Sequence, residues 1–189
     1  MRVRKKQRIF LACLFLVIRG ALSHCQETDN KLLHHIETKY TILTFTGPDH
    51  VKDFSKKIKY GSNQIPFGKL FRKTDTAHMT EQLKSAIDLL FEKVQQILDM
   101  RKKMPKVNIR VCEDNETLQQ AFFRYYNTDC THRAWYIYET NTIYLNLKDV
   151  NSHILAHEMA HSIINHYLLI RPPHASAEIL ARYVDTHLE

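Results

Sequence analysis

The stretch that decides the fold is His157-Glu158-Met159-Ala160-His161. Histidines four positions apart lie one turn apart on one face of an α-helix, so both imidazoles can reach a single metal ion. Glu158 is rotated by about 100° from the first histidine, which places its carboxylate beside the metal. From there it can take a proton from water, as a zinc hydrolase requires. The flanking residues are uncharged, which favours a buried helix; two core histidines satisfied by hydrogen bonds are the alternative interpretation.

The first 23 residues are typical of a secretory signal peptide. A basic segment, 1–8, precedes ten apolar residues, 9–18, which are too few to span a bilayer comfortably, and Ala21-Leu22-Ser23 provides small residues for cleavage. We therefore expect residues 24–189 to form one domain that is secreted or periplasmic, with no stable membrane span after signal removal. A short membrane anchor is one alternative, and a lipoprotein anchored through Cys25 is another.

Most of the excess positive charge belongs to this leader. The whole chain has 27 Lys+Arg and 20 Asp+Glu, a net charge of +7, and six of the basic residues but no acidic ones precede residue 24. The remaining 21 basic and 20 acidic residues leave a net charge of +1. This balance gives no support to nucleic-acid binding, so we expect no nucleic-acid partner.

Cysteine usage agrees with export. Cys112 ends a strand-like run and Cys130 lies in the polar loop before the next run. In an exported protein this arrangement predicts a Cys112–Cys130 disulfide. The sequence contains no C-x-x-C pair, so a cysteine zinc site is not expected.

The order of predicted elements indicates an α+β fold, a small mixed sheet packed on helices. Apolar and β-branched runs predict strands at 39–45, 107–112, 134–138 and 142–147, the last two forming a hairpin around 139–141. Periodicity and start signals predict helices at 48–58, 80–102, 115–126, 151–168 and 176–187. Residues 26–36 have the composition of a polar lead-in, and 60–76 that of an irregular segment.

A catalytic zinc site needs a third protein ligand. His166 lies about 140° round the helix from His161 and is expected to face away from the metal. The carboxylates that follow are Glu178, Asp185 and Glu189. A helix that folds back after Pro172-Pro173 would bring Glu178 alongside the two histidines. The alternative for Glu178 is an acid that interacts favourably with a helix N-terminus.

Residues 134–187 resemble the core of the gluzincin metallopeptidases, most closely the small minigluzincin or peptidase-MA-like type. The resemblance rests on 142–145, on the H-E-x-x-H helix and on Glu178-Ile179-Leu180-Ala181-Arg182-Tyr183-Val184-Asp185. It implies a zincin-like fold with a C-terminal glutamate-bearing helix and one Zn²⁺ per chain, held by His157, His161 and Glu178. Glu178 follows His161 by only 17 residues, so a compact site is implied.

The resemblance also implies roles for other residues. Glu158 would be the general base and then the general acid. Asp185 would orient a ligand or would simply be a solvated acid on the last helix. The strand segment Trp135, Tyr136 and Ile137 would form the rim along which an extended peptide pairs, or its side chains would only pack in the sheet. His174 and Tyr183 are candidate donors to the transition state.

These features together predict an exported zinc metallopeptidase that acts on peptides or proteins, as an endopeptidase more than as an exopeptidase. Two alternatives stay open. One is a latent or non-catalytic zinc-binding domain, in which the tail ending at Glu189 lies near the cleft. The other is a binding module without metal, whose aromatic strand recognises a partner.

Overall fold

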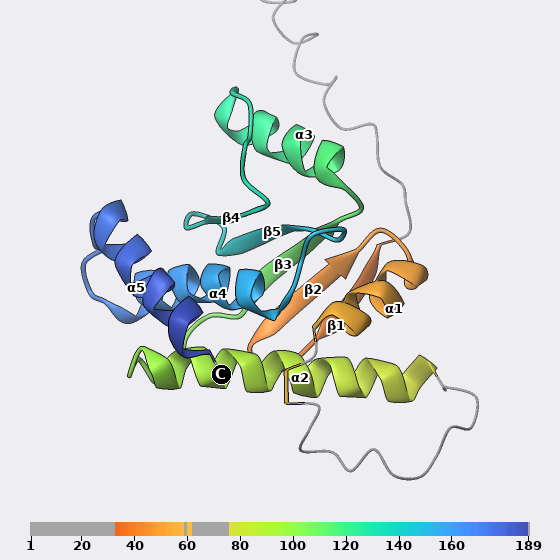
Figure 1. The fold of residues 1–189 in the computed structure, drawn as a ribbon, viewed down its shortest axis with the longest axis horizontal. Helices are drawn as coiled ribbons and strands as arrows, with labels where there is room; N and C mark the ends of the chain where they lie inside the picture. The colour runs from red at the N-terminus through yellow and green to blue at the C-terminus, as the bar shows by residue number, and fades with distance from the viewer. Residues whose placement is uncertain (1–32, 59, 62–75, 189) are drawn as a thin grey trace, which may run out of the picture. The chain divides into compact units, whose positions relative to one another are not determined.

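Five β-strands form one mixed sheet in the order β1-β2-β3-β5-β4 (Figure 1). They are β1 (His34–Glu37), β2 (Thr41–Phe45), β3 (Val107–Cys112), β4 (Ala134–Ile137) and β5 (Thr142–Asn146). β2, β3 and β5 are parallel, whereas the outer strands β1 and β4 run antiparallel to their neighbours. The register aligns two rows of buried side chains across the central strands: Leu43, Ile109 and Ile143, and then Phe45, Val111 and Leu145.

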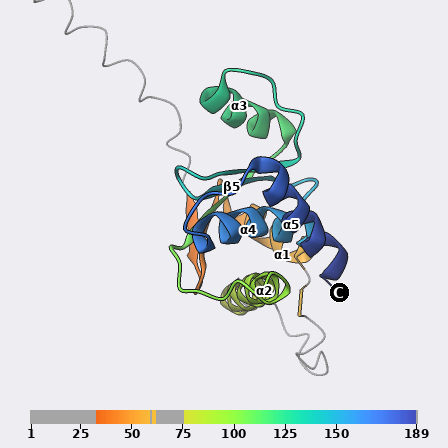
Figure 2. The ribbon, with the colours of Figure 1, turned by 90° about the vertical axis from the view of Figure 1, so that its left-hand side faces the viewer.

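Five helices surround this sheet: α1 (Pro48–Lys57), α2 (Thr76–Ile97), α3 (Asn115–Tyr126), α4 (Ser152–Tyr167) and α5 (His174–His187). In both ribbon views α3 lies on the opposite side of the sheet from α2 and α4 (Figures 1 and 2). α5 packs mainly on α4. The main core joins the sheet to α1, α2, α4 and α5, because their apolar stripes all face it.

The computed structural model describes residues 33–58, 60–61 and 76–188. All of them belong to one of the two units into which the chain divides, Leu32–Glu189. The expected leader, Cys25 and nearly all of the expected irregular segment 60–76 lie outside the described residues. No helix within the described ranges combines the length and apolar character needed to cross a membrane.

The α+β prediction with a mixed sheet is confirmed, and two element predictions are wrong. Residues 34–36, expected at the end of the polar lead-in, belong to the strand β1 (His34–Glu37). Only Ile36 of this edge strand is buried, so its sequence carries little apolar signal. The helix expected at 80–102 spans 76–97 instead. The chain turns at Asp99, whose φ of 52° is left-handed and cannot continue a helix.

The predicted disulfide is also wrong, because Cys112 and Cys130 are free thiols that do not lie within bonding distance. Both are buried in a second apolar cluster, around Trp135, on the α3 side of the sheet. Burial raises the pKa of the Cys112 thiol to about 11. The prediction placed the two cysteines at the ends of adjacent strands, but β5 lies between β3 and β4.

Asn141, in the turn between β4 and β5, connects the hairpin to the rest of the fold. Its backbone has a φ of 45°, a left-handed conformation that asparagine tolerates. Its Oδ1 accepts hydrogen bonds from Ser162 Oγ at 2.7 Å and Tyr136 Oη at 3.1 Å, and its Nδ2 donates to Lys106 O at 3.1 Å. The hairpin is therefore tied to α4 and to the start of β3.

Replacing Asn141 should destabilise the fold, because Asn141→Ala leaves buried partners without hydrogen bonds. We expect a loss of about 2–4 kcal/mol in the free energy of unfolding, measured by urea denaturation. The control is Asn127→Ala, which changes an exposed asparagine with a similar φ of 51°. It should lose no more than about 1 kcal/mol. Equal losses in the two variants would show that the buried hydrogen bonds contribute nothing.

Candidate metal centre

Helix α4 carries the two motif histidines at the edge of its buried face. Asn151 caps its N-terminus by accepting a hydrogen bond from Ile154 N at 3.0 Å, as predicted. The residues that face the main core are fully buried: Leu155, Ala156, Met159, Ala160 and Ile163. Because this face fixes the rotation of the helix, His157 and His161 are held where they stay partly exposed.

Helix α5 brings the third residue. The chain leaves α4, passes Pro172 and Pro173, and returns as α5 against α4 (Figure 1). α5 buries small side chains, Ala177, Ala181 and Val184, in the main core. Small residues at a helix contact allow the two backbones to approach closely. Glu178 and Asp185, each one position beyond a buried residue, consequently lie beside the histidines of α4.

The ligand atoms of His157, His161 and Glu178 lie within 4.8 Å of one another, a group that could hold a metal ion. The two Nε2 atoms are 3.3 Å apart. Glu178 places one carboxylate oxygen 3.1 Å from His161 Nε2 and the other 3.8 Å from His157 Nε2. The structure thus brings together the three residues that the sequence assigned to the metal.

Asp185 fixes the orientation of His157. Its Oδ2 lies 2.9 Å from His157 Nδ1. A carboxylate only accepts hydrogen bonds, so Nδ1 carries a proton that it donates to Asp185, and this contact turns Nε2 toward His161 and Glu178. This carboxylate–histidine arrangement is the usual outer contact of a metal-binding histidine. Burial and the neighbouring His157 lower the pKa of the His161 imidazole to about 4, so this imidazole is neutral at neutral pH.

Glu158 is a buried carboxylate without a protein partner. Its residue is 8% exposed, and it forms no hydrogen bond or ion pair with any other described residue. Burial, together with the nearby carboxylates of Glu178 and Asp185, raises the pKa of Glu158 to about 8. Buried polar groups normally have partners, so an unpartnered one in a cleft is a candidate functional group.

The cleft that Glu158 lines has a volume of about 540 Å³. Its other residues come from α4, from Asp185 and from the segment that leads into β4: Thr131, His132, Arg133, Ala134, His153, Ile154 and His157. The sequence interpretation missed His132, Arg133 and His153. His153 precedes His157 by four positions, so helical spacing could have placed it near the site. His132 and Arg133 precede β4 and carry no comparable signal.

The remaining candidate residues are divided between the site and the sheet. Trp135 and Ile137 are buried in the second cluster, so their side chains pack as in an ordinary sheet. β4 nevertheless ends the described sheet, and its outer main-chain edge has no strand partner there. His174 Nε2 is 3.8 Å from a Glu178 oxygen. Tyr183 instead stacks on His187, with ring centroids 3.9 Å apart.

His166 lies outside the cluster, as the sequence predicted. Its Nδ1 bonds to the main-chain oxygen of Ser162 at 3.0 Å and lies 3.4 Å from Tyr136 Oη. The first contact lies within α4, and the second joins the end of α4 to the β4–β5 hairpin.

Comparison with protein-family models, with curated proteins and with solved structures finds no match for this chain. The interpretation of the site therefore depends on its own residues and geometry.

Removing the carboxylate of α5 should abolish tight zinc binding. Two histidines supply only two of the three protein ligands that a catalytic zinc site needs, so Glu178→Ala should bind zinc orders of magnitude more weakly than the wild type. Titration against a competing chelator and metal analysis after gel filtration measure this, with about one zinc per chain expected in the wild type. Glu116→Ala, which removes an exposed acid on α3, is the control and should bind like the wild type. Unchanged zinc in Glu178→Ala would mean that another residue is the third ligand.

Removing the partner of His157 should weaken zinc binding without abolishing it. In Asp185→Ala the imidazole loses the hydrogen bond that sets its tautomer, and we expect zinc affinity to fall about 10- to 100-fold at unchanged stoichiometry. The same titration gives both values. Wild-type affinity in this variant would show that the contact plays no part in the metal site.

Proposed function

We propose that this chain is an exported zinc-dependent metallopeptidase that cleaves peptide bonds within peptides or proteins. The observation that carries the proposal is Glu158, a buried carboxylate without a partner among the described residues, in a cleft beside three candidate zinc ligands. A group placed in this way can exchange a proton with a substrate or a water molecule in the cleft. A purely structural histidine pair would need no such carboxylate.

The residues present fit zinc. Two imidazole nitrogens and one carboxylate oxygen form a common ligand set of catalytic zinc sites. His157, His161 and Glu178 would hold the ion, and Asp185 would keep the His157 lone pair directed at it. All three ligand residues stay partly exposed, so the site is open to substrate. When bound, zinc supplies a Lewis acid that polarises a carbonyl oxygen and lowers the pKa of water.

The chain's own residues then account for the movement of protons. Glu158 would accept a proton from the attacking water and return it to the leaving nitrogen. The outer edge of β4 would pair with an extended peptide, and Ala134 of that strand also lines the cleft beside Glu158. This binding mode needs no free chain end, which favours an endopeptidase. His174 is retained as a candidate donor because it lies near Glu178.

The alternative is a zinc-binding domain of the same fold without catalysis. In a latent form of this domain, the C-terminal tail would lie near the cleft. Leu188, the last described residue, is instead buried in the main core and does not line the cleft. The proposal that the protein is exported, and that a lipid anchor at Cys25 is a candidate, is supported only by the sequence of the leader.

The test is Glu158→Gln, which keeps the shape of the side chain but removes its basicity. We expect bound zinc and urea stability close to the wild type, with peptide cleavage lower by about 10²- to 10⁴-fold. Cleavage of a peptide library by the zinc-loaded protein, followed by mass spectrometry, measures the activity. Glu139→Gln, at an exposed position of the hairpin, is the matched control and should cleave normally.

The outcomes separate the two functions. Equal cleavage by wild type and Glu158→Gln would contradict the proposed mechanism. Zinc binding by both proteins with cleavage by neither would favour the non-catalytic domain.

A further inference from the structure

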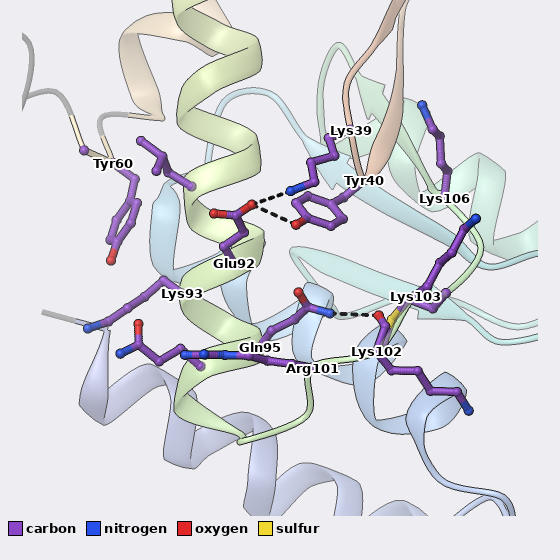
Figure 3. A pocket seen from close by; sticks show the side chains of 14 residues that line it. Lys39, Tyr40, Tyr60, Glu92, Lys93, Gln95, Arg101, Lys102, Lys103 and Lys106 are labelled. Carbon is purple, nitrogen blue, oxygen red and sulfur yellow. Dashed lines mark hydrogen bonds and ion pairs between the residues drawn. The ribbon is translucent and has the colours of Figure 1, made fainter.

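A second cavity, of about 1080 Å³, is lined by none of the candidate metal-site residues (Figure 3). It lies on the C-terminal half of α2 and on the segment that joins α2 to β3. Its cationic residues come from three parts of the chain: Lys39, Lys93, Arg101, Lys102, Lys103 and Lys106. We call this cavity the basic groove.

Acidic groups of the described residues leave most of the positive charge in the basic groove uncompensated. Among the described residues, Glu92 is the only acidic one that lines the groove, and it accepts hydrogen bonds from Lys39 Nζ at 2.9 Å and Tyr40 Oη at 2.7 Å. Lys106 pairs with Glu37 at 2.7 Å. The other four cations form no ion pair with any described residue: Lys93, Arg101, Lys102 and Lys103.

The backbone that presents three of these cations is anchored. The buried Gln95 donates from its side-chain Nε2 to Lys102 O at 3.3 Å, and its main-chain oxygen accepts from Met100 N at 2.9 Å. Arg101, Lys102 and Lys103 therefore project from a segment held against the end of α2. Three consecutive cations on one anchored segment concentrate positive charge along the groove, and this positive potential favours an anion.

The shape of the groove indicates the kind of anion. Figure 3 shows Tyr60 and Lys93 on one side of α2 and Lys102, Lys103 and Lys106 on the other. The cations thus extend across the helix in a concave surface. A flat membrane would touch only the rim of such a surface, whereas an extended chain can follow it.

We propose that the basic groove binds the sulfate or phosphate groups of an extended polyanion. Five of its six cations are lysines, whose compact ammonium groups bind sulfate and phosphate as point charges without a fixed geometry. A polyanion that displaces its counterions onto several such cations gains affinity that falls with salt. This site does not depend on the proposed peptidase activity.

The test compares the full chain with two triple variants. Arg101→Gln/Lys102→Gln/Lys103→Gln removes the anchored cations. The control, Lys52→Gln/Arg110→Gln/Arg124→Gln, removes the same charge from exposed positions outside the groove. Binding is measured by calorimetry at several salt concentrations, with heparin as the sulfated probe and linear polyphosphate as the phosphate probe. Poly-glutamate tests for binding of a carboxylate polyanion, and mixed phosphatidylcholine–phosphatidylserine vesicles test for binding of an anionic membrane.

We expect heparin or polyphosphate to bind the wild type and the control variant with equal affinity. The probe that binds more tightly identifies whether sulfate or phosphate groups are the anions that the groove prefers. The groove variant should bind about 10- to 100-fold more weakly, with a salt dependence shallower by up to about three released counterions. Equal weakening in the two variants, binding only to poly-glutamate or vesicles, or no binding at all would overturn the proposal. Unchanged urea stability of the groove variant would exclude misfolding as the cause of a loss.

Discussion

The candidate site depends on one contact, the close packing of α5 on α4. Ala177 and Ala181 are buried in the same core as Ala156 and Ala160, and such small side chains let the helices approach closely. Each acid of α5 that faces the histidines follows a buried residue, so the packing also sets where the carboxylates point. A larger side chain at Ala181 would push the helices apart and separate Glu178 from both imidazoles. The ligand geometry is thus a consequence of core packing.

Around this contact the protein keeps polar groups where an apolar core would be more stable. Glu158 is largely buried, lines the cleft and forms no hydrogen bond with another described residue. A polar atom that is buried without a partner typically costs about 1–3 kcal/mol. Asp185 Oδ1 is likewise buried without a hydrogen-bond partner. The two aligned rows of aliphatic and aromatic side chains in the central strands offset this cost. Local violations of the rules for stable cores tend to gather at functional sites, and Glu158 and Asp185 both lie beside His157. Trp135 Nε1, which is also buried without a hydrogen-bond partner, lies apart from them in the second apolar cluster.

The parts of the structure that depend on local rules could be predicted from the sequence. Helical spacing placed His157 and His161 on one face, Asn151 marked the start of α4, and the Pro172-Pro173 break indicated a returning helix. The parts that depend on strand order could not be predicted: β5 separates the strands that were expected to bring Cys112 and Cys130 together. Arg101 and Lys102 were assigned to the end of a long helix, where charges are usually solvated. These residues line the groove with Lys103 because the chain turns at Asp99 and because Gln95 hydrogen-bonds to Lys102, and neither feature could be read from the sequence.

The central claim is that α4 and α5 together hold one zinc ion. Anomalous diffraction at the zinc edge, from crystals of the full chain grown with zinc, tests it most directly. The account predicts one strong peak per chain, about 2.0–2.2 Å from the Nε2 atoms of His157 and His161 and from a carboxylate oxygen of Glu178. No peak between these residues, or a peak bound by other side chains, would contradict the account.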